Sequence, residues 1–151
     1  MRLSLFKLSS AVLLGLSLQL SAADTLEDAA NLQQLGDQYP TEVIVLMVSQ
    51  DNCSYCVRVK REYLEPMLAS NNAPPIRILH IDRTQAIIDF DGEQRDASLI
   101  ASRLGGRFTP TLIFVDSKGE PIHPPIIGLN TPDYYGFYLD EAIRMARQQL
   151  N

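Results

Sequence analysis

The chain has 151 residues, of which 46% are hydrophobic, and this is enough for one domain with its own core. Its formal net charge is −5, so the sequence lacks the basic excess of a nucleic-acid-binding protein, and we expect no nucleic-acid partner. Only two cysteines are present, which excludes a disulfide-rich scaffold.

The N-terminal residues have the three-part pattern of a secretory signal peptide. Arg2 and Lys7 form a basic region, residues 8–20 are mainly apolar, and small residues at 21–23 offer a cleavage site. The apolar stretch is shorter than the roughly 20 residues that span a bilayer, which argues against an uncleaved anchor. We therefore expect a signal peptide at 1–23 and a mature domain at 24–151. Export to the periplasm would place both cysteines in an oxidising compartment.

The first half of the mature chain predicts alternating helices and strands. Residues 24–39 have the pattern of a helix, with Thr25 and Asp28 as its capping box. The continuous apolar run at 43–48 predicts a strand covered on both faces. A helix at 53–69 follows, which Pro66 should kink or close early, and then a strand at 76–81.

The second half predicts a strand hairpin between two helices. Residues 83–95 are expected to form a long loop, whose Ile87, Ile88 and Phe90 enter the core or extend an apolar rim. A helix at 96–104, a strand at 111–116, an edge strand at 120–127 and a final helix from Thr131 follow. This order predicts an α/β fold with a central mixed sheet flanked by helices.

The motif Cys53-Ser54-Tyr55-Cys56 follows the buried strand and opens a helix. Free backbone N–H groups and the helix dipole at that position favour the thiolate, which is the reactive form of cysteine. Such a pair can close a disulfide and exchange electrons with another protein through a mixed disulfide. A purely structural disulfide is the first alternative, but so small a loop would stabilise the fold little.

A metal site is the second alternative for the two cysteines. A structural zinc needs four ligands, and the mature chain adds only His80 and His123 to the cysteines. His80 falls in a predicted strand and His123 lies among prolines, so we interpret both as ordinary packed or solvated side chains. We expect no metal at this site.

Several motifs in the same order resemble the thioredoxin family across residues 42–149. They are the cysteine motif after a buried strand, Thr109-Pro110 before the third strand, the hairpin at 118–120 and Gly128 before the last helix. The resemblance implies a thioredoxin-like fold, a cis Pro110 packed against the cysteines, and no cofactor besides them. It also implies that Cys53 attacks, Cys56 resolves the mixed disulfide, and the substrate is bound by Ser54, Tyr55, Thr109 and Pro110.

The resemblance carries expectations about partners. Tyr55 before the second cysteine and Thr109 before the proline are similar to the catalytic domains of bacterial disulfide isomerases of the DsbC type. We expect a monomeric, exported thiol–disulfide oxidoreductase that acts on protein cysteine pairs and exchanges electrons with a membrane thiol carrier. A disulfide isomerase and a non-catalytic binding module with this fold are the alternatives.

One departure from the family concerns a buried acid. Thioredoxins usually carry an acid six residues before the first cysteine and a lysine near it on the next strand. The matching residues here are Met47 and Ile78, so the acid and its partner have been lost together. We expect Cys56 to lose its proton without that base, unless Asp51 takes the role; we interpret Asp51 as a solvated loop residue.

Overall fold

A mixed five-stranded sheet forms the centre of the protein in a computed structural model that describes residues 25–70 and 72–151. The signal peptide expected at 1–23 lies outside the described residues. Two strands lie parallel to their neighbour β3, and the other two pairings are antiparallel. In spatial order the strands are β1 (Glu27–Asp28), β3 (Ile76–His80), β2 (Ile44–Ser49), β6 (Thr111–Val115) and β7 (Pro121–Ile127).

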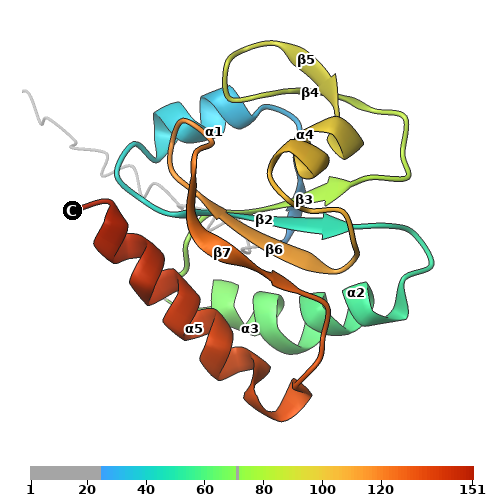
Figure 1. Ribbon diagram of the computed structural model, residues 1–151, viewed down its shortest axis with the longest axis vertical. Helices are drawn as coiled ribbons and strands as arrows, with labels where there is room; N and C mark the ends of the chain where they lie inside the picture. The colour runs from blue at the N-terminus through green and yellow to red at the C-terminus, as the bar shows by residue number, and fades with distance from the viewer. Residues whose placement is uncertain (1–24, 71) are drawn as a thin grey trace, which may run out of the picture.

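Helices cover both faces of this sheet (Figure 1). One face carries α1 (Leu32–Gln38) and α4 (Ala97–Arg103). The other carries a helical run followed much later in the chain by α5 (Pro132–Gln149). No helix in the described part of the chain is long and apolar enough to cross a membrane. The architecture is the thioredoxin-like fold that the sequence predicted.

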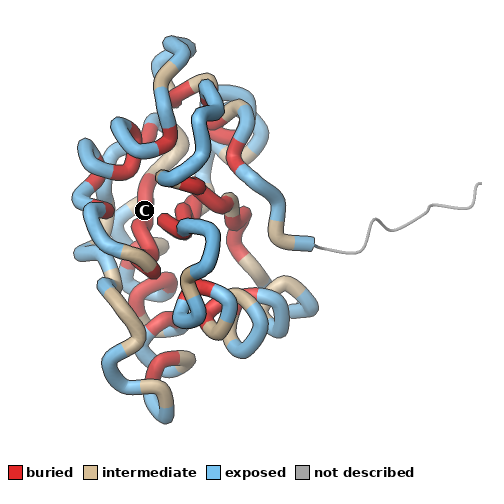
Figure 2. Tube along the Cα trace, turned by 90° about the vertical axis from the view of Figure 1, so that its right-hand side faces the viewer, coloured by how far each residue is buried: buried red, intermediate tan, exposed pale blue. Residues whose placement is uncertain are grey.

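Strand β2 divides two hydrophobic cores. Its alternate residues Val45 and Met47 pack with α5, whereas Leu46 and Val48 pack with α1 and α4. Because side chains alternate across a strand, a strand buried on both faces must be apolar throughout, as residues 43–48 are. Figure 2 shows the buried segments at the centre of the molecule and exposed segments around them.

The helical run after the cysteines contains an irregular turn where the sequence predicted a disturbance. It consists of α2 (Ser54–Val59), a π-helical turn (Lys60–Leu64) and α3 (Glu65–Leu68). The N–H of Glu65 donates to the carbonyl of Lys60, five residues earlier. Pro66 has no N–H, and its ring would clash with a carbonyl in a regular helix. The wider turn just before Pro66 lets the helical run continue instead of ending there.

The helix expected at 24–39 is wrong in its first half. Residues Glu27–Asp28 form β1 instead, where Glu27 pairs with Arg77 of β3 and also makes an ion pair of 3.0 Å with it. The helix begins only at Leu32. The side chain of Asn31 accepts a hydrogen bond of 2.8 Å from the N–H of Gln34, so Asn31 rather than Thr25 is the cap.

The loop expected at 83–95 is also wrong, because it contains an antiparallel hairpin of β4 (Ala86–Ile88) and β5 (Gln94–Asp96). Ile87 belongs to the core between the sheet and the helices α1 and α4, and Phe90 packs against that core. The buried carboxylate of Asp89 binds Arg95 and Arg103, which ties the hairpin to α4. The hairpin is therefore part of the folded domain, and Ile87 is a core residue rather than part of a rim.

We expect Ile87→Ala to lower the free energy of unfolding by about 2–5 kcal/mol, because it removes buried methyl groups and leaves a cavity. Ile87 is 2% exposed, whereas Leu99 on α4 is 61% exposed. Leu99→Ala should therefore change stability by no more than about 0.5 kcal/mol. Urea unfolding followed by circular dichroism measures both. Equal effects of the two substitutions would contradict the anchoring of the hairpin in the core.

Candidate active site

Cys53 and Cys56 stand at the start of α2 and form a disulfide, with their Cα atoms 5.2 Å apart. Cys53 is the N-cap: its sulfur accepts a hydrogen bond of 3.1 Å from the N–H of Cys56, and its carbonyl accepts one from Val57. The sulfur of Cys53 thus faces the free N–H groups of the helix. Negative charge on Cys53 after reduction is stabilised by these groups and by the helix dipole.

The two sulfurs differ in their access to solvent. Cys53 is partly exposed, whereas Cys56 is 1% exposed and belongs to the core between the sheet and α5. A partner protein can reach Cys53 directly, and Cys56 is shielded behind it. This asymmetry agrees with the predicted roles, in which Cys53 meets the partner and Cys56 resolves the mixed disulfide.

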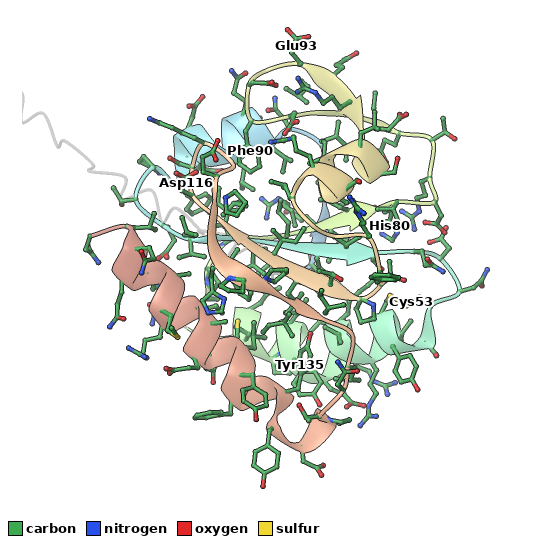
Figure 3. The ribbon with its side chains drawn as sticks, viewed as in Figure 1. Cys53, His80, Phe90, Glu93, Asp116 and Tyr135 are labelled. Atoms are coloured by element: carbon green, nitrogen blue, oxygen red, sulfur yellow. A yellow bond between two sulfur atoms is a disulfide. The ribbon has the colours of Figure 1, made fainter. Side chains whose placement is uncertain are left out.

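The two segments predicted to form the site adjoin the end of β2 and the start of β6, which lie side by side in the sheet. Val48 pairs with Thr111, so β6 begins beside the end of β2, where the loop to Cys53 departs (Figure 3). The Thr109–Pro110 peptide bond is cis. The carbonyl of Pro110 accepts a hydrogen bond of 2.8 Å from Gly128, which ties the loop to the end of β7. Contact of Pro110 with the cysteines remains a prediction.

The predicted substrate-binding residues differ in exposure. Ser54 and Tyr55 lie on the outside of the helix start, and the Tyr55 side chain is 60% exposed. Thr109 is half-buried and Pro110 is buried. Tyr55 and Thr109 are therefore accessible to a partner, while Pro110 supports the loop from inside.

Phe108 was not predicted as a site residue, although it directly precedes Thr109-Pro110. Its side chain is 68% exposed, and its own backbone carbonyl accepts a hydrogen bond of 2.8 Å from the Thr111 hydroxyl. This large aromatic side chain lies in solvent next to the predicted substrate-binding residues Thr109 and Pro110, which makes Phe108 a candidate contact residue. The sequence could have indicated Phe108 as a site residue, because it is an aromatic residue in a loop directly before Thr109-Pro110.

The core behind Cys56 is apolar at the two positions where the family usually places an acid and a lysine. Met47 and Ile78 are direct register partners on β2 and β3, and both are buried in the same core as Cys56. The hydroxyl of Tyr135 also lies in this core, but burial raises its pKa, so it stays protonated and does not act as a base. The predicted loss of the buried acid and lysine pair agrees with this arrangement.

Asp51 lies in an ion-pair network rather than alone in the loop before Cys53. Its carboxylate accepts hydrogen bonds of 2.7 and 3.2 Å from Arg83, and its N–H donates to Asp82. The hydrogen bond from Arg83 holds the pKa of Asp51 below its usual value, and the charge of Arg83 adds to this effect. Asp51 is exposed, as predicted, but its stabilised carboxylate is a weak proton acceptor.

Comparison with known proteins assigns the family. The sequence profile described as a thioredoxin-like domain matches residues 33–143, so the chain belongs to the thioredoxin-like family. With its disulfide-bonded cysteine motif, it is a thioredoxin-like domain equipped for thiol–disulfide redox chemistry. No curated protein sequence matches the chain.

Solved thioredoxins have a similar fold. A mutant thioredoxin from Halobacterium salinarum is 20% identical, with a TM-score of 0.52 over 82% of this chain and 95% of that one. Fasciola hepatica thioredoxin is 15% identical, with a TM-score of 0.53 over 79% and 97%. Thioredoxin F from spinach chloroplast is 15% identical, with a TM-score of 0.53 over 81% and 96%. At these identities the likeness shows the fold alone.

Proposed function

We propose that this protein is a periplasmic thiol–disulfide oxidoreductase that exchanges electrons with cysteine pairs of other proteins. The observation that carries the proposal is the asymmetry of the cysteine pair. Cys53 is accessible and faces the helix N-terminus, while Cys56 is buried directly behind it. A structural disulfide needs no such exposed and stabilised sulfur, whereas exchange with a partner does.

The exchange proceeds in two steps. The Cys53 thiolate attacks one sulfur of the partner's disulfide, that bond breaks, and the other partner sulfur leaves and takes up a proton. Cys56 then loses its proton and attacks the Cys53 sulfur, which releases the second partner sulfur and forms the Cys53–Cys56 bond. Two electrons pass from the pair to the partner. The same steps in reverse oxidise a partner dithiol.

The exposed side chains around Cys53 support docking of an extended protein segment. Tyr55 and Phe108 are large exposed side chains on the two segments that adjoin β2 and β6, and Thr109 offers backbone groups beside them. A segment lying along Thr109 would pair with its backbone as an added strand does. We further propose that the protein works as a monomer and exchanges electrons with a membrane thiol carrier after each reaction with a partner.

Reduction of insulin by dithiothreitol tests the proposed activity. The wild-type protein should accelerate the precipitation of the insulin B chain, because each cycle passes two electrons to an insulin disulfide. The variant with Cys53→Ala and Cys56→Ala should match the reaction without enzyme. Equal rates for wild type and this variant would leave the protein as a non-catalytic binding module.

Fractionation of cells that express the full chain tests the proposed compartment. The mature protein should be recovered from the periplasm, and mass spectrometry should place its new N-terminus near Asp24. Recovery from the cytoplasm with the N-terminus intact would refute export.

We expect Phe108→Ala to raise the KM for a protein substrate by about five-fold or more, because a few large contact side chains carry most of the binding energy of a protein interface. The rate with a small disulfide that does not reach Phe108 should stay unchanged. Phe137→Ala is the matched control, since Phe137 is also an exposed phenylalanine but lies on α5. Steady-state kinetics with insulin and with a small disulfide would separate the two effects. Equal changes in both substitutions would contradict the docking role.

A further inference from the structure

A buried histidine stands beside carboxylates at the end of β3, outside the cysteine pair. His80 is the last residue of β3 and pairs with Ser49 at the end of β2, so it lies next to the loop that carries Asp51 (Figure 3 labels His80). Asp28 is the last residue of β1, on the other side of β3, and Asp82 lies two residues after His80. Residues from three neighbouring strand ends therefore meet around one imidazole ring.

The hydrogen bonds of the ring identify its free nitrogen. Nε2 of His80 lies 3.1 Å from Oδ1 of Asp28, so Nε2 carries the proton and donates to that carboxylate. In a neutral ring this leaves a lone pair on Nδ1. His80 is 9% exposed, and its buried Nδ1 has no hydrogen-bond partner within the part of the chain that the structure describes. Buried ring nitrogens are normally satisfied, so this lone pair needs a partner.

Two carboxylates lie close to this imidazole ring. Nδ1 of His80 is 3.6 Å from Oδ1 of Asp51, and one ligand atom from each of Asp51, His80 and Asp82 lies within 4.8 Å of the others. Ligand atoms at normal bonding distance from a tetrahedral zinc are about 3.3–3.6 Å apart. The histidine and Asp51 already have this spacing. Asp82 is exposed, and its carboxylate lies beside Asp51, whose N–H donates to it over 2.7 Å.

We propose that His80, Asp51 and Asp82 bind a divalent cation of the zinc class, with water completing its coordination. One imidazole nitrogen and two carboxylates suit zinc-class cations, whereas Mg²⁺ and Ca²⁺ prefer oxygen ligands throughout. Asp28 has the place of the carboxylate that commonly orients a metal-binding histidine from its far nitrogen. The site uses neither cysteine, so it is available while Cys53 and Cys56 are joined.

Arg83 competes with the cation for the same carboxylates. Its guanidinium lies 2.7 Å from Asp51 and 3.0 Å from Asp28, and thereby neutralises them when no metal is bound. A cation at His80 must displace this contact with Asp51. Removing the guanidinium should therefore strengthen metal binding, although it would weaken a purely structural ion-pair network.

Calorimetric titration of the oxidised protein with zinc chloride tests the proposal. The disulfide form removes thiolates as competing ligands. We expect one zinc per protein, with no competition from excess Ca²⁺. His80→Gln should abolish binding, whereas His123→Gln, the matched control, should leave it unchanged. Asp28→Asn should weaken binding about 10–100-fold, as loss of an orienting carboxylate does.

Two exposed variants keep the test decisive if His80→Gln fails to fold. Asp82→Asn should weaken zinc binding, and Arg83→Gln should strengthen it, with both proteins folded by circular dichroism. The proposal is overturned if the wild type binds no zinc, if His123→Gln removes the binding, or if Arg83→Gln weakens it. Binding that Asp82→Asn leaves unchanged would equally overturn it.

Discussion

We expect Cys56→Ala to accumulate mixed disulfides with partner proteins, and Cys53→Ala to accumulate none. Cys53 is the accessible sulfur at the helix N-terminus, and Cys56 is enclosed in the core behind it. Without Cys56 the mixed disulfide at Cys53 is not resolved, so the complex persists. Without Cys53 no sulfur is left that a partner can reach. Non-reducing electrophoresis of the exported fraction, followed by mass spectrometry, measures the trapped complexes.

The serine variants supply the control for this experiment. Cys56→Ser should trap the same partners as Cys56→Ala, because both remove the resolving sulfur. Every complex should disappear on treatment with dithiothreitol. If Cys53→Ala traps as many partners as Cys56→Ala, the assignment of roles to the two cysteines is wrong.

The second large effect concerns the proton on Cys56. The pairing of Met47 with Ile78 leaves this core without the acid that usually serves there, and Asp51 is held as a stabilised carboxylate by Arg83. General acid–base assistance is worth about 10²–10⁴ in rate where it operates. Burial also disfavours the Cys56 thiolate. We therefore expect a slow resolving step whose rate rises with pH, since higher pH increases the thiolate fraction.

Stopped-flow reduction of a model disulfide between about pH 6 and 9 measures this dependence. The experiment should be run with a chelator, for wild type and for Asp51→Asn. The wild-type rate should rise across the range, and the substitution should not change the shape of the profile. A pH-independent wild-type rate would contradict the missing base, and a large loss in Asp51→Asn would make Asp51 the base.

The parts of the fold predicted from sequence are those whose pattern is set by local burial. The apolar run at 43–48 supplies most of β2 (Ile44–Ser49), which is buried on both faces. The stripe of α5 with Leu139 and Ile143 lies in the core that also holds Cys56. Position at a helix start likewise predicted the asymmetry of Cys53 and Cys56. In each case the predictive pattern lies within one element, either as a continuous apolar run, as a repeat at the helical period, or as a position at the start of a helix.

The parts that were missed depend on distant partners. The exposed pair Glu27–Asp28 has no apolar alternation and is a strand only because it pairs with β3. The hairpin of β4 and β5 has only three residues in each strand, and its anchor Asp89 binds Arg103 from a different element. A local sequence pattern contains neither of these contacts.

The histidine site shows the same limit. His80 was predicted to be an ordinary packed or solvated residue, and its position in a strand was correct. Its neighbours Asp28 and Asp51 come from the ends of two other strands, and only the parallel pairing of β1, β3 and β2 brings them together. The spacing of these residues along the chain resembles no metal-binding motif.

The reduction potential of the Cys53–Cys56 couple tests the central claim most directly. Equilibration with glutathione redox buffers, followed by alkylation and mass spectrometry, gives its value. A couple that exchanges electrons with protein partners should lie between about −270 mV and −120 mV, the range of dedicated thiol–disulfide exchange proteins. A value below about −300 mV, where structural disulfides lie, would contradict the proposed function.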